Sequence, residues 1–374
     1  MRLTDTAHGR GMGAGAQCAV VLLLLVESTH SSPEVPLGGA LNLFSRYGYL
    51  SISMRVVPRN DSGPPWIVRE PTVDVFRNSS SLRQPAPSAS SAPSGPRPGA
   101  APVFHGDFHM EFCDNLRQLK QAYFRDFHME LLEQPWRAFT ASWGRQTLAR
   151  HLGINVSYAA GQFSYVMLRV ARYRDSGRLA PPAPGAAVEP DVTAAADSVL
   201  PGDPLSVARF VKKFGSHYVA AFVSGNSLYQ ASLLIHYRTC HGTVFVYTPQ
   251  IYSKIKARLR SQGLADLSSG ELSNFFSPWY AEHIGTIQSA SGNSSLDVWA
   301  SSRLAVHFYF FTYSSLLKLH GNSSLLKELD SLLLNEALLQ LDLRTMAVAF
   351  GDPDRRTWFL EVLDNHLKLW QVNM

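Results

Sequence analysis

A segment rich in proline, serine and alanine at residues 77–102 limits where this chain can build a folded core. The segment, RNSSSLRQPAPSASSAPSGPRPGAAP, has almost no aliphatic side chains, so it cannot bury enough surface to offset the entropy cost of ordering. It predicts a disordered, extended linker. A small N-terminal segment at 29–76, with a short strand from Leu50 to Val56, would precede it, and the main domain would occupy 103–374.

Residues 1–28 have the three parts of a secretory signal peptide. Arg2 and Arg10 supply a positive n-region, and an unbroken apolar run follows at 16–26. Val26 and Ser28 place suitable residues at the −3 and −1 positions of a cleavage site. The apolar run is too short for a membrane span, which takes about 20 residues. We therefore expect a secreted, extracellular protein.

The glycosylation sequons agree with secretion. Five of the twelve asparagines stand in N-x-[ST], whereas chance would supply about two. We expect glycans on most of these sites, which are Asn60, Asn78, Asn155, Asn293 and Asn322.

Charge and cysteine content narrow the class of protein further. The net charge of +5 and the pI near 9.1 favour anionic surfaces, such as lipid head groups or sulfated matrix. The charge excess is too small to indicate a nucleic-acid-binding surface. The alternative to binding an anionic surface is that the excess charge only keeps the protein soluble. Cys18 leaves with the signal peptide, so Cys113 and Cys240 can form one disulfide at most. The main domain must therefore depend on a hydrophobic core.

Periodicity in the first half of the main domain predicts strands and helices together. A period-2 strand runs from Phe104 to Cys113, and a helix follows that Asp114 caps and Pro135 ends. A second strand is expected at 163–173, and 175–203 is expected to be a loop rich in proline and alanine.

The second half begins with clear helix boundaries. Asp203 and Pro204 start a helix that Gly215 stops, and a strand follows at 217–223 before a turn at Gly225-Asn226. A strand at 244–247 and a helix at 248–262 come next, and the pattern of the last hundred residues is mostly helical.

The chain has few groupings that suggest chemistry. His105, His109, Glu111 and Cys113 share one face of the first strand, but alternate strand residues are about 6.6 Å apart. Four of them cannot bind one ion without a bulge, so we expect a solvent-facing strand edge. The motifs G-x-S-x-G, H-E-x-x-H, C-x-x-C and the Walker loop are all absent from the sequence. We expect no catalytic residues, metal, cofactor, small-molecule substrate or nucleic acid.

The helix expected at 248–262 has a narrow apolar stripe with cations on both sides. Such a basic amphipathic helix can lie on an anionic membrane or another polyanion. An ordinary core-facing helix with cations at its solvent boundary is the alternative. The cations are Lys254, Lys256, Arg258 and Arg260.

The segment Phe214-Gly215-Ser216-His217-Tyr218 resembles the signature Y/W-G-[ST]-H-F/Y of the membrane-attack-complex/perforin (MACPF) family. It stands between an expected helix and an expected strand, as the signature does, and Phe214 replaces Tyr or Trp conservatively. The resemblance implies an α+β fold: a MACPF-like bent antiparallel β-sheet with surrounding helices and a helical C-terminal part. No catalytic residues come with the family, and these positions would shape the fold.

Longer stretches at 111–127, 277–285, 316–326 and 361–374 resemble a secreted branch of this family that acts in embryonic terminal patterning. The resemblance implies an extracellular modulator of signalling by the receptor tyrosine kinase Torso. Its implied partners are that receptor or its secreted cysteine-knot ligand, at a membrane surface or in extracellular matrix. Relative to this branch, Ala231 to Thr243 is an insertion that would have to bulge from the sheet or come from an unusual transcript or gene model.

In perforin-like proteins two helical clusters unfurl into membrane-spanning β-hairpins, and a hairpin needs about 20 residues. The loop expected upstream of the signature helix is 175–203, and its five prolines remove donors that a barrel must pair. We therefore expect surface binding without pore formation. An oligomeric pore-forming immune effector of the perforin type is the alternative function.

Overall fold

A computed structural model describes residues 37–44, 74–77, 83–84, 106–159, 163–180, 188–234, 257, 283–291, 293–308, 311–320, 322–333 and 337–373. All of them belong to one compact unit, Pro33–Met374. The signal peptide, the strands expected at 50–56 and 244–247, and nearly all of the helix expected at 248–262 lie outside the described residues.

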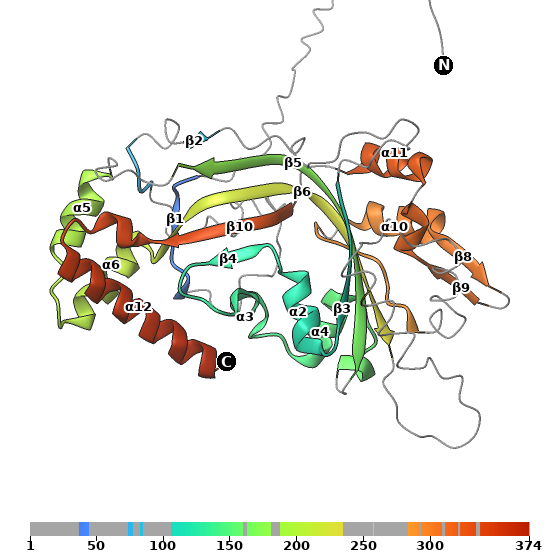
Figure 1. Cartoon of the computed structure of the whole chain (residues 1–374), viewed down its shortest axis with the longest axis horizontal. Helices are drawn as coiled ribbons and strands as arrows, with labels where there is room; N and C mark the ends of the chain where they lie inside the picture. The colour runs from blue at the N-terminus through green and yellow to red at the C-terminus, as the bar shows by residue number, and fades with distance from the viewer. Residues whose placement is uncertain are drawn as a thin grey trace, which may run out of the picture. The chain divides into compact units, whose positions relative to one another are not determined.

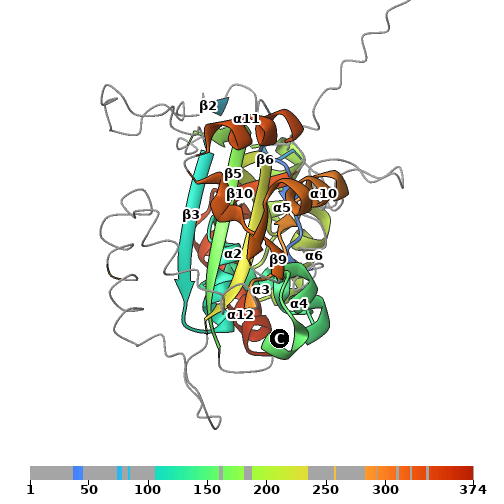
Figure 2. The ribbon, with the colours of Figure 1, turned by 90° about the vertical axis from the view of Figure 1, so that its right-hand side faces the viewer.

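Two long antiparallel strands, β5 (Ser164–Leu179) and β6 (His217–Leu234), form the centre of an eight-stranded sheet. Strand β3 (Gly106–Cys113) pairs with the first half of β5, and β10 (Ala337–Thr345) pairs with the first half of β6, both antiparallel (Figure 1). Figure 2 shows β3, β5 and β6 side by side. The short strands are β1 (Ala40–Leu41), β2 (Arg83–Gln84), β4 (Phe127–Met129) and β7 (Gln288–Ser289).

The sheet bends where β5 and β6 pass from one partner strand to the other (Figure 1). The register of β5 shifts between Tyr173 and Asp175, beside Gly225 of β6. A Cβ on Gly225 would lie 2.0 Å from the carbonyl oxygen of Arg172, so no other residue fits there. The turn predicted at Gly225-Asn226 is therefore wrong, because the glycine serves a close approach of two backbones and the strand continues.

The larger core lies between the sheet and two groups of helices. The connection from β3 to β5 contains α2 (Leu116–Tyr123), α3 (Pro135–Thr140), α4 (Arg145–Leu152) and the 3-10 helix η4 (Val156–Ala159). Helices α5 (Pro190–Asp197), α6 (Pro204–Phe214) and α12 (Pro353–Asn373) gather where β6 begins (Figure 1). Met167, Tyr229 and Leu341 of the sheet join Phe139 and Phe359 of the helices in this core.

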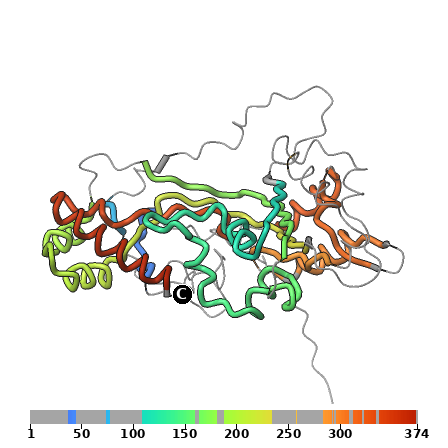
Figure 3. Tube along the Cα trace, turned by 60° about the horizontal axis from the view of Figure 1, so that its bottom comes forward, coloured from blue at the N-terminus to red at the C-terminus, as the bar shows by residue number. Residues whose placement is uncertain are grey.

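A second, smaller core covers the other face of β5 and β6 near β3. Its helices are α10 (Ser294–Arg303), α11 (Ser323–Leu332) and the 3-10 helix η6 (Leu316–Leu319), with a hairpin of β8 (Ala305–Phe308) and β9 (Phe311–Ser314). Leu168 and Leu228 of the sheet pack with Trp299 and Leu329. Figure 3 shows this orange group at the opposite end of the sheet from α5, α6 and α12.

The helix predicted from Asp114 to Pro135 is shorter than expected. The N-cap of α2 is Asn115, whose side chain accepts a hydrogen bond from the Gln118 amide, and α2 ends at Tyr123. Phe127 lies in β4, parallel to β10, and Pro135 opens α3 instead of ending a helix. Pairing with β10 overrides the helical periodicity of this segment.

Two further predictions are corrected by the structure. The segment 175–203 is not one loop, because β5 extends to Leu179 and α5 occupies Pro190–Asp197, while residues 181–187 lie outside the described part of the chain. The predicted helical C-terminal part is confirmed by α12, but the prediction that the last hundred residues are mostly helical is wrong at β10, which is a strand. Leu339, Leu341 and Leu343 of β10 are buried, whereas the polar residues between them, Gln340, Asp342 and Arg344, are more exposed, so this segment has the alternation of a strand and not the period of a helix.

The segment interpreted as an insertion begins inside β6. Ala231 to Leu234 pair in register with β5, from Ala231 opposite Met167 to Leu234 opposite Ser164, so these residues do not bulge. Its remaining residues, 235–243, lie outside the described part of the chain. Within the segment interpreted as a linker, Arg83 and Gln84 form β2 and pair with Leu179 and Arg178.

Several predictions are confirmed. Helix α6 spans Pro204–Phe214 as expected, and the strands expected at 163–173 and 217–223 are parts of β5 and β6. The fold class is α+β, with a bent sheet that is antiparallel at every described strand pair except β4–β10. None of the helices in the described ranges combines the length and hydropathy of a membrane-spanning segment.

Candidate functional site

The signature segment connects α6 to β6 through a backbone that requires glycine. The Asp203 side chain accepts a hydrogen bond from the Leu205 amide and starts α6, and Phe214 ends it in contact with Phe210. Gly215 has φ +89°, and a Cβ there would lie 2.8 Å from the carbonyl oxygen of Leu41. Both the left-handed backbone and the contact with the N-terminal strand exclude a side chain at this position.

His217 is fully buried, and both ring nitrogens have partners. Its Nε2 is 3.1 Å from the Glu130 carbonyl oxygen, so it donates there, and Nδ1 accepts from the Ser216 hydroxyl at 2.9 Å. Burial lowers the pKa of His217 to about 4, and the neighbouring Glu130 offsets only part of that effect. His217 is therefore a neutral structural group with no ring nitrogen left for a substrate.

Four segments distant in sequence meet around this histidine. The Ser216 hydroxyl accepts from the Leu43 amide at 3.0 Å, and the Ser216 carbonyl accepts from the Met346 amide at 2.9 Å. The Glu130 carboxylate accepts from the Thr345 amide at 2.6 Å. We call Leu43, Glu130, Ser216, His217 and Thr345 the signature junction, which joins the segment after β1, the end of β4, the start of β6 and the end of β10.

A pocket of about 670 Å³ opens beside the signature junction. Tyr218, the last signature residue, is part of the wall of this pocket. Burial is the main cause, and the negative charge of Glu130 the second, that raises the pKa of Tyr218 to about 12. We call it the sheet-face pocket; its lining residues are Glu130, Arg178, Leu179, Ala180, Tyr218, Ala220, Asp342, Arg344, Thr345, Ala347 and Val348.

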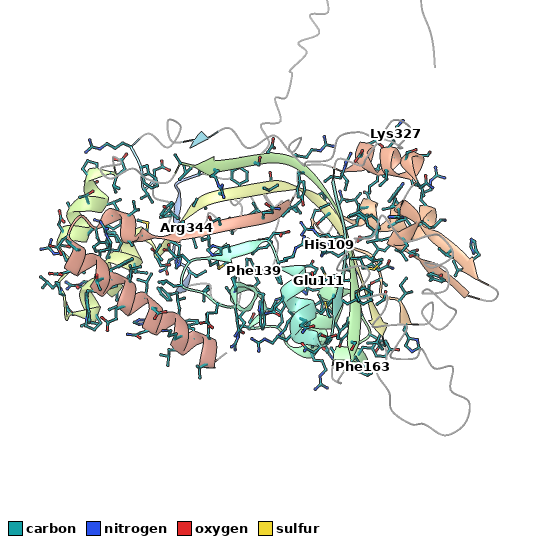
Figure 4. All side chains as sticks on the ribbon, viewed as in Figure 1. His109, Glu111, Phe139, Phe163, Lys327 and Arg344 are labelled. Atoms are coloured by element: carbon teal, nitrogen blue, oxygen red, sulfur yellow. The ribbon has the colours of Figure 1, made fainter. Side chains whose placement is uncertain are left out.

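The sheet-face pocket presents charges of both signs. Asp342 accepts from Arg344 at 3.1 Å and lies 2.9 Å from Nδ1 of His128, while Arg178 is exposed. Arg344 on β10 lies well apart from His109 and Glu111 on β3 (Figure 4). The cavity therefore combines guanidinium donors, carboxylate acceptors and alanine side chains.

A second buried polar group lies on β5, in the larger core. Arg169 is 2% exposed, forms an ion pair with Asp126 and has its guanidinium 5.8 Å from the centroid of the Tyr229 ring. Burial alone would lower the pKa of Arg169, but Tyr229 and Asp126 hold that pKa above its ordinary value. Among the described residues, the Nε and Nη2 atoms of Arg169 have no hydrogen-bond partner.

This group continues to the molecular surface. Arg125 lies next to Asp126 and donates from Nη1 to Nε2 of His109 at 2.6 Å, and His109 is 3.3 Å from Glu111. We call these five residues the arginine network: Arg169, Asp126, Arg125, His109 and Glu111. It connects strands β3 and β5 to the turn between α2 and β4.

The residues considered for a metal site are distributed differently from the prediction. His109 and Glu111 are partly exposed and lie 3.3 Å apart, but Cys113 is fully buried, so the expected solvent-facing edge is wrong at that residue. His105 lies outside the described residues. In the described ranges, no three His, Cys, Asp or Glu side chains come close enough to hold a metal ion.

Three of the five predicted glycosylation sites fall in the described residues. Asn155 and Asn322 are exposed, and Asn293 is partly buried as the N-cap of α10. Asn60 and Asn78 lie outside the described part of the chain, as do Cys240, Lys254, Lys256, Arg258 and Arg260. The disulfide and the basic surface therefore stay predictions.

Sequence reasoning identified the signature but missed its contacts. Leu43, Glu130 and Thr345 carry no local signal, because they reach Ser216 and His217 through tertiary structure. Arg169 had a detectable signal, since it is a lone cation among apolar residues of the strand SYVMLRVA.

No protein-family model matches the sequence, and no curated protein does. Among solved structures, GNIP1Aa from Chromobacterium piscinae aligns with TM-score 0.41 and 11% identity, over 72% of this chain and 46% of that chain. A cell invasion protein with a MAC/Perforin domain from Bacteroides thetaiotaomicron aligns with TM-score 0.40 and 10% identity, over 88% and 59%. This chain thus spans about half the length of these two proteins.

A third structure is Astrotactin-2, a vertebrate perforin-like membrane protein involved in neuronal development. It aligns with TM-score 0.27 and 10% identity, over 55% of this chain and 68% of that chain. All three alignments are partial, so the description of the fold depends on the strand pairing and the signature junction themselves.

Proposed function

We propose that this chain is a secreted, glycosylated member of the MACPF family that acts by binding protein partners, and that it is not an enzyme. The observation that carries the proposal is the burial of the signature. Its histidine is neutral, fully buried and bonded at both nitrogens, so the signature holds segments together instead of reacting with a substrate. The neighbouring sheet-face pocket is open and offers polar groups to a partner.

The finer proposal concerns the signalling pathway. The stretches at 111–127, 277–285, 316–326 and 361–374 resemble Torso-like, a secreted perforin-domain protein. On that resemblance we propose that this chain modulates signalling by the receptor tyrosine kinase Torso in embryonic terminal patterning. Its partner would be the receptor or its secreted cysteine-knot ligand.

The surface at which it acts would be a membrane or the extracellular matrix, including the matrix at the egg surface. The net charge of +5 and the basic residues Lys254, Lys256, Arg258 and Arg260 support attraction to an anionic surface. Neutralising these four cations together should weaken binding to anionic vesicles, whereas unchanged binding would place them at the boundary of a core-facing helix.

A pore-forming effector is the second candidate, and one observation favours it. Two connections join neighbouring antiparallel strands: 114–163 between β3 and β5, and 235–336 between β6 and β10. Each exceeds the about 20 residues that a spanning hairpin needs. The loss of pairing donors to prolines was inferred for 175–203, but the connection at 114–163 is a second upstream segment long enough for a hairpin, so those prolines no longer exclude a pore.

A pair of measurements separates the two candidates. Purified secreted protein is added to anionic liposomes that contain dye, and in parallel to cells that carry the receptor and its ligand. We expect receptor activation without dye release. Dye release at nanomolar concentration, or rings on liposomes in electron micrographs, would assign the chain to the pore-forming class.

A further inference from the structure

A second cavity, of about 500 Å³, lies at the end of α4, far along the chain from the signature. Its volume is within the range of about 300–1,000 Å³ that is typical of small-ligand pockets. We call it the α4 pocket; its lining residues are Ala149, Arg150, Gly153, Ile154, Asn155, Tyr158, His283, Ile284, Gly285, Thr286 and Gln288.

The two walls of the α4 pocket are bonded to each other and to the sheet. Gly153 ends α4 with φ +66°, and its carbonyl accepts from the Thr286 amide at 2.8 Å. The Gly285 amide donates to the Ala231 carbonyl of β6 at 2.9 Å, and the Gln230 side chain donates to the Gly285 carbonyl at 2.9 Å. The pocket is therefore a preformed cavity and not a gap between independent loops.

One wall contains a glycosylation sequon. Asn155 is exposed, and its Oδ1 accepts from both the amide (3.0 Å) and the hydroxyl (2.9 Å) of Ser157. These bonds orient the side-chain amide. Its Nδ2, the atom to which a glycan attaches, donates no hydrogen bond within the described residues.

Side chains from both walls of the pocket offer groups that suit a sugar ring. The rings of Tyr158 and His283 are 5.9 Å apart and tilted by 34°, which offers aromatic surface to the apolar face of a pyranose. Gln288 and Arg150 add polar groups that can bond its hydroxyls and its acetamide.

A second exposed sequon provides a comparison within the same chain. Asn322 caps α11 by accepting from the Leu325 amide at 3.1 Å, and it lines neither of the two pockets described above. A glycan on Asn322 would extend into solvent.

We propose that the α4 pocket binds the first N-acetylglucosamine residues of a glycan attached to Asn155. The sugar then contacts both α4 with η4 and the segment 283–288, and it stabilises their packing. This inference rests on the proposed secretion and glycosylation, because the ligand is the chain's own glycan.

The test uses the full chain secreted from a glycosylating host, with occupancy of each sequon measured by mass spectrometry. Native protein is treated with peptide N-glycosidase, and cleavage is followed at Asn155 and Asn322. We expect cleavage at Asn155 to be at least about tenfold slower, because the first sugar must leave the pocket before the bond is accessible.

Matched variants separate the sugar from the side chain. Ser157→Ala removes the sequon while keeping Asn155, and Ser157→Thr keeps the sequon. We expect Ser157→Ala and Asn155→Gln to lower Tm by about 2–4 °C, and Ser157→Thr and Asn322→Gln to leave it unchanged. Tyr158→Ala should lower Tm less in the Asn155→Gln variant than in the glycosylated protein, because the contact between the sugar and Tyr158 is already lost in that variant.

The outcomes distinguish the inference from the function on which it rests. Glycans elsewhere with an empty Asn155, or equal cleavage rates and equal Tm values for the Asn155 and Asn322 sites, would overturn the α4 pocket assignment alone. A chain with no glycan on any sequon would overturn the proposed secreted function as well.

Discussion

The signature junction and the arginine network both place polar side chains in or beside the larger core, but they satisfy these groups differently. His217 is neutral, and each of its nitrogens has a partner. Arg169 is charged and depends on the Asp126 carboxylate, and two of its nitrogens have no hydrogen bond within the part of the chain that the structure describes. A neutral, fully bonded group costs little to bury, whereas a buried charge is tolerated only while its counter-ion stays in place.

The difference predicts different roles for the two sites. The signature junction stabilises the meeting of four chain segments. The arginine network contributes less net stability, because its Coulomb energy is offset by desolvation, but it specifies where the turn between α2 and β4 sits on β5. Substitutions that break one partner at a time should therefore separate the two sites.

The largest effect is expected when Asp126 is replaced. Asp126→Ala leaves the Arg169 guanidinium buried without a counter-ion, so we expect the free energy of unfolding to fall by about 3–5 kcal/mol. Urea denaturation followed by circular dichroism measures this loss. As a control, Arg169→Met combined with Asp126→Leu should recover most of the stability, since no charge then remains inside. A single-variant loss below about 1 kcal/mol would contradict the description of Arg169 as desolvated.

The pH dependence of the signature junction is the next largest effect. The pKa of His217 is about 4 in the folded protein and near 6.5 when the chain is unfolded. Between those values the unfolded chain binds the additional proton, so the stability from His217 is complete above pH 6.5 and falls as pH decreases toward 4. The total is roughly 3 kcal/mol.

Thermal unfolding between pH 7 and 4.5 tests this pH dependence. His217→Gln keeps hydrogen-bonding capacity without a group that titrates in this range, so its Tm should depend less on pH than that of the natural protein. Parallel curves for the two proteins would show that His217 does not remain neutral in the folded state.

A smaller effect is expected for Glu130, which accepts from the Thr345 amide. Glu130→Gln retains an acceptor but loses the charge that strengthens this bond, so we expect a loss of about 1 kcal/mol. Glu130→Ala should cost more, because the Thr345 amide is then left without its acceptor. Equal losses in the two variants would mean that the bond contributes no stability.

The smallest effect on stability is expected at Arg344, whose side chain is 49% exposed. Arg344→Ala removes a surface ion pair with Asp342 and should change the free energy of unfolding by no more than about 0.5 kcal/mol. Receptor activation should nevertheless decrease if the sheet-face pocket binds a partner. Full activation by this variant, with normal folding, would exclude Arg344 from the partner surface.

Local signals explain which elements could be predicted from the sequence. Asp203, Pro204 and Gly215 determine the ends of α6 through contacts within a few residues, and the signature then marks the start of β6. Alternation identified parts of β3 and β5 for the same reason. The signal peptide, the glycans and the signalling role remain predictions.

Other elements could not be predicted because their conformation depends on distant partners. The sequence around Phe127 has helical periodicity, but the segment forms a strand because it pairs with β10. Gly225 is typical of a turn in the sequence, but in the structure it allows the backbone to approach Arg172 at the bend. The sites divide in the same way. The signature motif is local, but Leu43, Glu130 and Thr345 join it from positions far away in the sequence.

By itself, the sequence determined the limits of α6, the glycine that follows it and parts of the strands on either side, because each depends on neighbouring residues. The tertiary structure alone decided the bend, the course of β10 through the sheet, the burial of Arg169 and the bonds of His217. Those features arise from packing between segments that are distant along the chain, and no short pattern records which distant groups will meet when apolar surface is buried.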